Sequence, residues 1–309
     1  MLFLKTLYQI LIMFFYMVPA FILKKIDWVK TEHLYSISTI LLYVIVPGLV
    51  LDTFQKCEFS KHTISELGKM FLMSFLMQMI AVGILILIFY KKIDEPKYRV
   101  AIAAGIFGNT GFVGLPIVIA LFPGVSEALI YVIAFTMIEN VLFYTVVAYC
   151  VTFDKKFISV KKAILNPATL SFIFAFIVYL TKWKYPDELA DAIASVGKMS
   201  TISSMQLLGI RLASLKSLLN LFRRPFVYLA VAIKLVIFPL FCYVVCNWIP
   251  WWDQYFVPVL VVEAATPTAA FVSIISEQYG KEQELASNSV LLTSIACVAT
   301  LPTISLLFE

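Results

Sequence analysis

The sequence predicts an all-α, polytopic membrane protein. Of its 309 residues, 61% are hydrophobic and 14% are charged, whereas a soluble domain carries about 25% charged residues. The mean hydropathy of +0.93 indicates that lipid surrounds most of the chain. The third observation is a series of apolar runs of about 20 residues, the length of one spanning helix. Soluble enzymes, disordered proteins and fibrous proteins are therefore excluded.

Ten apolar runs follow one another between clusters of charge, glycine and proline. Their length and their lack of alternating polarity predict helices and not barrel strands. We expect the first run to be a membrane helix and not a cleaved signal sequence, because Lys5 is its only early charge and no small-residue cleavage site follows. The expected spans are 4–23, 34–54, 70–90, 100–122, 128–153, 168–180, 189–212, 226–248, 256–275 and 285–307.

Basic residues accumulate in alternate loops. The loop 154–167 contains four lysines, whereas the short segments after Phe122 and after Trp248 contain none. The positive-inside rule places the basic loops in the cytoplasm and both termini outside the cell. The net charge of +5 is therefore a topology signal of a multi-pass plasma membrane protein, and no nucleic-acid partner is expected.

The same loop, 154–167, divides the chain into five expected spans on each side. We therefore expect one integral transmembrane domain built from two five-helix repeats, 1–155 and 156–309. An odd number of spans in each half gives the halves opposite orientations, which is the arrangement of inverted-repeat secondary transporters.

The fourth span of each half has a centre unsuited to a continuous helix. The first contains glycines at every third position before a proline, and the second has a proline between two threonines. Because proline removes a backbone donor and clashes with the preceding turn, we expect two broken helices that cross near the bilayer midplane; the alternative is a proline kink in a packed bundle. Broken helices offer N–H groups to an anion and carbonyl groups to a cation. The glycines, prolines and threonines of the two interrupted centres are Gly105, Gly108, Gly111, Gly114, Pro116, Thr266, Pro267 and Thr268.

The stretch 108–116, Gly-Asn-Thr-Gly-Phe-Val-Gly-Leu-Pro, resembles the signature of the auxin efflux carrier family, which includes bacterial malate and malonate permeases. Segments 47–48, 166–167, 266–269 and 300–302 also resemble it. The resemblance implies ten spans in a five-plus-five inverted repeat, related to the bile-acid symporter fold. It also implies that helices four and nine cross in a transport domain, which moves against a scaffold of spans one, two, six and seven. The long central loop of the plant members is missing, which favours a compact prokaryotic permease over a carrier of auxin itself.

Polar residues inside the apolar runs are the candidate site residues, because an unpaired polar group in lipid is costly. Asn109 and Thr110 either bind a substrate carboxylate or satisfy the carbonyl groups that Pro116 frees. Gln206 and Arg211 are secondary candidates. The full set expected to bind substrate is Asn109, Thr110, Gly111, Pro116, Asn140, Thr266, Pro267 and Thr268.

Three charged residues are candidates for charge balance or ion coupling. Lys234 either extends towards the cytoplasmic headgroups or provides a fixed positive charge that attracts an organic anion or replaces a coupling cation. Glu263 is a proton or cation site, a counter-charge for a buried base, or an interfacial residue at the outer end of its span. Glu139 lies in mid-span beside Asn140.

These features predict a secondary transporter that moves a small organic anion by elevator-type alternating access. The substrate is a dicarboxylate such as malate or malonate, or an auxin-like carboxylate. The alternative is a channel-like protein, or an ion-coupled symporter or antiporter of the bile-acid symporter type with a different substrate. Besides the substrate and the bilayer, a proton or sodium ion and a second copy of the chain are candidate partners. No enzyme motif, P-loop, metal cluster or disulfide framework appears, so no catalytic activity, cofactor or metal is expected.

Overall fold

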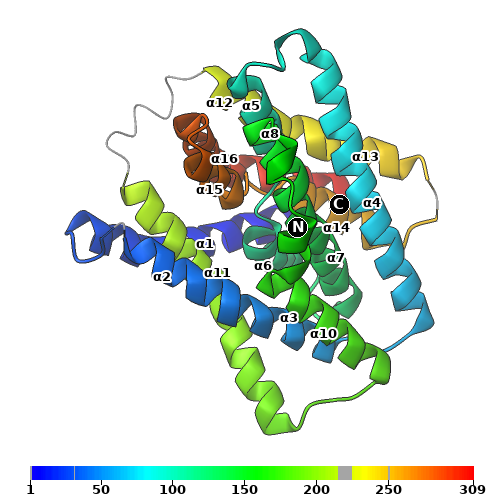
Figure 1. Ribbon diagram of the computed structural model, residues 1–309. Coiled ribbons are helices and arrows are strands. Elements are labelled where there is room, and N and C mark those ends of the chain that lie inside the picture. Colours follow the sequence, from blue (N-terminus) through cyan, green and yellow to red (C-terminus); the bar gives the residue numbers. More distant parts are fainter. Residues whose placement is uncertain (1, 31, 215–224, 250) are drawn as a thin grey trace.

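The computed structural model describes residues 2–30, 32–214, 225–249 and 251–309, and within these every regular element is a helix (Figure 1). Six continuous helical segments are long and apolar enough to cross a membrane. They are α1 (Leu2–Lys25), α2 to α3 (His33–Lys56), α4 (Lys61–Ile88), α7 to α8 (Ser126–Thr152), α12 to α13 (Pro225–Asn247), and α16 with its last turn (Gln283–Phe308). A bent pair, Lys155–Leu165 and α10 (Pro167–Thr181), adds a seventh.

Helices occur in all ten apolar runs, but the six or seven spans in the described chain are fewer than the ten expected. The fourth run is divided into α5 (Pro96–Ile106) and the segment Thr110–Leu121, which consists of a π-helical turn and α6 (Leu115–Leu121). The ninth is divided into α14 (Phe256–Ala264) and α15 (Ala270–Tyr279). Each of these four half-helices is too short to span a bilayer alone. The seventh run forms α11 (Asp187–Ala213), which is long enough but polar.

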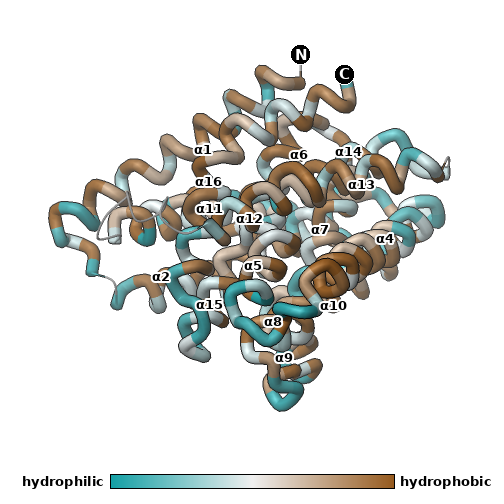
Figure 2. Tube along the Cα trace, turned by 90° about the horizontal axis from the view of Figure 1, so that it is seen from above, coloured by the Kyte–Doolittle hydropathy of each residue, from teal (hydrophilic) through white to brown (hydrophobic). Residues whose placement is uncertain are grey.

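Large hydrophobic side chains cover much of the outer surface. Phe15 on α1 is 70% exposed and Leu87 on α4 is 72% exposed. Figure 2 shows hydrophobic residues along α1, α4 and α10, with hydrophilic residues concentrated at turns between helices. Exposed apolar area of this extent marks a surface that meets lipid.

The helices are divided here into two groups, which also touch each other, since α1 packs against α6 and α16. In the first group, α11 packs along α1 and α3, and α3 also packs against α10. The second group contains α4 to α8 and α12 to α16. A Cβ added to Gly197 of α11 would lie 2.9 Å from the Leu49 Cα, so α3 and α11 touch through their backbones. This close crossing gives the first group a fixed geometry.

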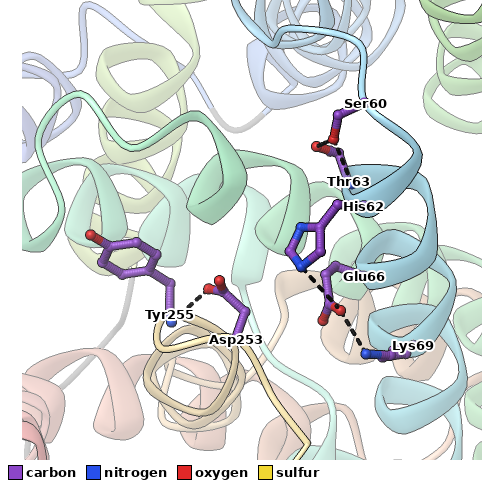
Figure 3. Close-up of polar contacts among 7 residues, drawn as sticks. All are labelled: Ser60, His62, Thr63, Glu66, Lys69, Asp253 and Tyr255. Carbon is purple, nitrogen blue, oxygen red and sulfur yellow. Dashed lines mark hydrogen bonds and ion pairs between the residues drawn. The ribbon is translucent and has the colours of Figure 1, made fainter.

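Polar side chains fix the start of α4, as Figure 3 shows. The Ser60 hydroxyl accepts a hydrogen bond from the Thr63 N–H at 2.9 Å, which caps the helix. One turn later the buried Glu66 carboxylate pairs with Lys69 at 2.6 Å and lies 3.8 Å from His62. In the neighbouring loop, Asp253 accepts a hydrogen bond from the backbone of Tyr255. Glu66 is thus a buried carboxylate with a partner.

Candidate functional site

The two broken helices meet at their breaks. Asn109 donates its backbone N–H to the Pro267 carbonyl at 2.7 Å, and Ala269 donates to the Phe107 carbonyl at 3.0 Å. These bonds form an isolated antiparallel bridge between Gly108 and Thr268. Each break therefore satisfies part of the other's unpaired backbone, as non-helical backbone at membrane depth requires.

The first break lies beside Asn109 and Thr110, in the glycine-containing stretch before Pro116. The helix stops at Ile106, and Pro116 is the second residue of α6. A π-helical turn, Thr110–Gly114, precedes it and widens the backbone. The prediction of a break in this span is confirmed, and the break consists of residues 107–109. In the second broken helix Pro267 does lie within the break.

Lys234 connects the two helix ends that precede the breaks. Its Nζ donates to the carbonyl groups of Ile106 and Ala264, both at 2.9 Å. These are the last residues of α5 and α14, whose C-terminal ends carry partial negative charge. The side chain is fully buried, so the expectation that Lys234 extends to the headgroups is wrong. Its long stem reaches the crossing, where carbonyl acceptors replace water.

Whereas Lys234 lies at the C-terminal ends of two half-helices, Glu139 lies at the N-terminal start of one. One carboxylate oxygen accepts the Gly108 N–H at 2.8 Å, and the other accepts the Thr110 hydroxyl at 2.8 Å. The Thr136 hydroxyl donates to Thr110 at 3.0 Å and extends the network. A carboxylate at the start of a helix is stabilised by the partial positive charge there. Lys234 and Glu139 therefore offset the charges of the broken helix ends.

Glu263 is also fully buried, which rules out the interfacial alternative. Neither of its carboxylate oxygens has a hydrogen-bond partner among the described residues. The carboxyl group lies against the backbone of Gly114, where an added Cβ would be 2.1 Å from Oε2. The Glu263 carboxyl group therefore fits here only because residue 114 is a glycine and has no side chain.

A cavity of ≈ 160 Å³, here called the crossing cavity, lies beside the breaks. The starts of both second half-helices line it, through Thr110 to Phe112 and through Ala270 and Phe271. The first N–H groups of a helix have no partner within the helix and attract anions. Arg211 also lines this cavity, and its Nε has no hydrogen-bond partner in the described part of the chain.

Most of the remaining lining is apolar. The polar side chains that contribute are Ser38, Asn109, Thr136 and Asn140, and no acidic side chain does so among the described residues. Three aromatic rings, Phe112, Phe143 and Phe271, form part of the wall. The lining therefore combines one cation and a few polar side chains with a mainly apolar wall.

The sequence-predicted residues separate into three sets. Asn109, Thr110, Gly111 and Asn140 line the crossing cavity. Thr266 and Thr268 are buried in the crossing, where their hydroxyls donate to the carbonyls of Glu263 at 2.7 Å and Ala104 at 2.6 Å.

The two predicted prolines lie elsewhere. Pro267 lines only a small space of ≈ 10 Å³. Pro116 lines another cavity, of ≈ 400 Å³, called here the Lys198 cavity because that lysine also lines it. Arg211 was only a secondary candidate from the sequence, although a basic residue near the end of a polar span indicates a candidate site residue.

Comparison with known proteins identifies a family whose model matches the chain twice, once in each half. The model of a family described as membrane transport protein matches residues 6–156 and 151–305. No curated protein matches the chain.

Proposed function

Because the chain belongs to the membrane transport protein family, that of the auxin efflux carriers, we propose that it is a secondary carrier of an organic anion in the plasma membrane. The observation that carries this proposal is the convergence of two half-helix N-termini and Arg211 on the crossing cavity. Each helix end contributes about half a positive charge. Glu139 already offsets much of this charge at the first helix end, through Gly108 and Thr110. Arg211 therefore supplies the main positive charge for one buried carboxylate.

The lining favours one of the two expected substrate classes. A dicarboxylate needs a second cationic partner, and the described lining offers only Arg211. An unpaired second carboxylate against the phenylalanine rings would be strongly disfavoured. A monocarboxylate with an apolar or aromatic body, that is, an auxin-like carboxylate, matches this lining. The lining thus favours a substrate class against which the missing central loop counted.

The arrangement of the two helix groups supports elevator-type movement. The crossing cavity and the Lys198 cavity follow one another along α3 and α11, and Leu49 and Leu115 line both. Leu49 belongs to the first group and Leu115 to the second. We propose that the first group is the scaffold, that the second carries the site past it, and that the ten runs form two inverted repeats, 1–155 and 156–309.

Uptake into proteoliposomes tests this function. Labelled indole-3-acetate, malate, malonate and succinate are supplied separately, with protein-free liposomes as the background. We expect saturable uptake of indole-3-acetate that unlabelled indole-3-acetate inside accelerates, and weaker uptake of the dicarboxylates. Uptake that neither saturates nor responds to internal substrate would indicate a channel and contradict a carrier.

Variants test the binding cavity. Arg211→Gln removes the cation and Asn109→Ala removes the amide. Losing one hydrogen bond to a charged group costs about 1.5–3 kcal/mol, so each variant should weaken apparent affinity roughly ten- to a hundred-fold. Lys25→Gln and Asn247→Ala are matched controls outside the cavity and should transport as the parent does. Equal affinity of parent and Arg211→Gln would contradict the proposed site.

A further inference from the structure

Glu263 differs from the other two charged groups at the crossing. Lys234 donates to two carbonyls, and Glu139 accepts from an N–H and a hydroxyl. Glu263 is equally buried, yet neither of its oxygens has a hydrogen-bond partner among the described residues. A buried carboxylate without donors is strongly disfavoured, whereas a neutral carboxylic acid is tolerated far better. This environment therefore favours the protonated form of Glu263 over the ionised one.

A bound proton explains this environment better than a bound metal ion. A cation at Glu263 would need several further oxygen ligands. The carbonyl groups of Glu263 itself and of Ala264, the next residue, already accept hydrogen bonds from Thr266 and Lys234. The described residues also contain no group of three or more acidic, histidine or cysteine side chains arranged to hold a metal.

The position of Glu263 connects it to the substrate site. Its carboxyl group lies against Gly114, in the same half-helix whose first residues line the crossing cavity. The helices packed against α14 are α4, α6, α7, α13 and α16, together with the π-helical turn before α6. Of all the charged groups in the described residues, Glu139 of α7 and Lys234 act electrostatically on Glu263. Cys242 of α13 acts on Lys234 instead.

The sum of these charges depends on Glu263. Glu139 and Lys234 cancel, so an ionised Glu263 leaves one net negative charge beside the cavity and a protonated Glu263 leaves none. Protonation therefore favours anion binding, and by linkage anion binding favours protonation to the same degree. Starting from the proposed function, we propose that Glu263 carries the coupling proton. One proton from the aqueous phase binds its carboxylate with each monovalent anion, and both are released on the other side.

Infrared spectroscopy tests the protonation without any substrate. The protein is labelled with ¹³C-glutamate and reconstituted in lipid nanodiscs at neutral pH. We expect a C=O band of a protonated carboxylic acid in the parent, absent in Glu263→Gln and retained in Glu66→Gln. Glu66 is the matched control because it is buried but paired with Lys69 (Figure 3). A parent spectrum without this band would overturn the proposal.

Proton-linked transport tests the coupling. An inward proton gradient should accelerate indole-3-acetate uptake by the parent and should carry protons inward with it. Glu263→Gln should lose at least nine-tenths of both effects while still exchanging labelled for unlabelled indole-3-acetate. Acceleration by a sodium gradient, or a normal proton response of the variant, would overturn the coupling. If the parent transports no indole-3-acetate, the proposed function fails, and the infrared band still decides whether Glu263 holds a proton.

Discussion

At the scale of single residues, one lysine holds the crossing together. Lys234 gives its charge to the ends of two helices that are far from it in sequence, Ile106 being 128 residues away. Its bonds to Ile106 and Ala264 satisfy carbonyl groups that the breaks leave without helical partners. Glu139 provides the compensating charge. The buried charges are thus part of the structure of the crossing as well as candidates for its function.

Removing this lysine should destabilise the protein. Lys234→Met keeps the length of the side chain but leaves two buried carbonyl groups and the Glu139 carboxylate without their cation. Breaking a buried charge network costs about 3–5 kcal/mol, so we expect a clearly lower melting temperature in detergent. Lys198→Met, at an exposed position on α11, should change stability by about 0.5 kcal/mol or less. Equal melting temperatures for the two variants would refute the structural role of Lys234.

At the scale of elements, π-helical turns precede three prolines at the same offset. The turns Leu41–Ile45, Thr110–Gly114 and Ile233–Ile237 are followed, after one further residue, by Pro47, Pro116 and Pro239. A π turn widens the helix locally, so the proline ring avoids the carbonyl group of the preceding turn. The helix axis is thereby preserved at each proline. The third of these turns also presents Lys234 to the crossing.

Close packing of α3 and α11 gives an element-scale prediction. In Gly197→Ala the new Cβ would lie 2.9 Å from the Cα and 3.1 Å from the N of Leu49. Because backbone atoms cannot rotate away, the two helices must separate, at a cost of about 1–3 kcal/mol. Gly83→Ala is the control, since nothing lies within 4 Å of its Cβ position, and it should gain about 0.5–1 kcal/mol. Thermal unfolding of both variants measures this. A stabilised Gly197→Ala would show that the contact is not tight.

At the scale of the whole molecule, the surrounding lipid determines where apolar and charged residues lie. The outer surface is apolar because it meets lipid, and the charged groups at the crossing are buried inside the protein or joined to backbone atoms. Arg211 differs from these charged groups, because it belongs to the first helix group and lines the crossing cavity. The site therefore needs both helix groups. A shift of one helix group relative to the other would change the side chains and N–H groups that a bound anion contacts.

Thiol labelling checks the expected orientation of the molecule. Ile158 lies in the basic loop and is 39% exposed, and Trp183 lies after α10 and is 53% exposed. A membrane-impermeant maleimide should label Trp183→Cys on intact cells and Ile158→Cys only after permeabilisation. The five native cysteines are all buried and give little background. The reverse pattern would place both termini in the cytoplasm.

The sequence by itself determined where helices form, because runs of about 20 apolar residues have one stable conformation in lipid. It also located both broken helices and drew attention to Glu139, Lys234 and Glu263. The first break lies in the glycine-containing stretch that the sequence indicated, and a π turn accommodates the proline that follows it.

Only the tertiary structure decided which groups meet. It showed that Lys234 turns inward to two helix ends, that Glu263 has no partner among the described residues, and that Arg211 joins Asn109 at one cavity. The physical reason is that these pairings connect residues far apart in sequence, 30 positions for Lys234 and Ala264 and 128 for Lys234 and Ile106. Local patterns of hydrophobicity and turn chemistry act over a few residues and carry no information about such contacts.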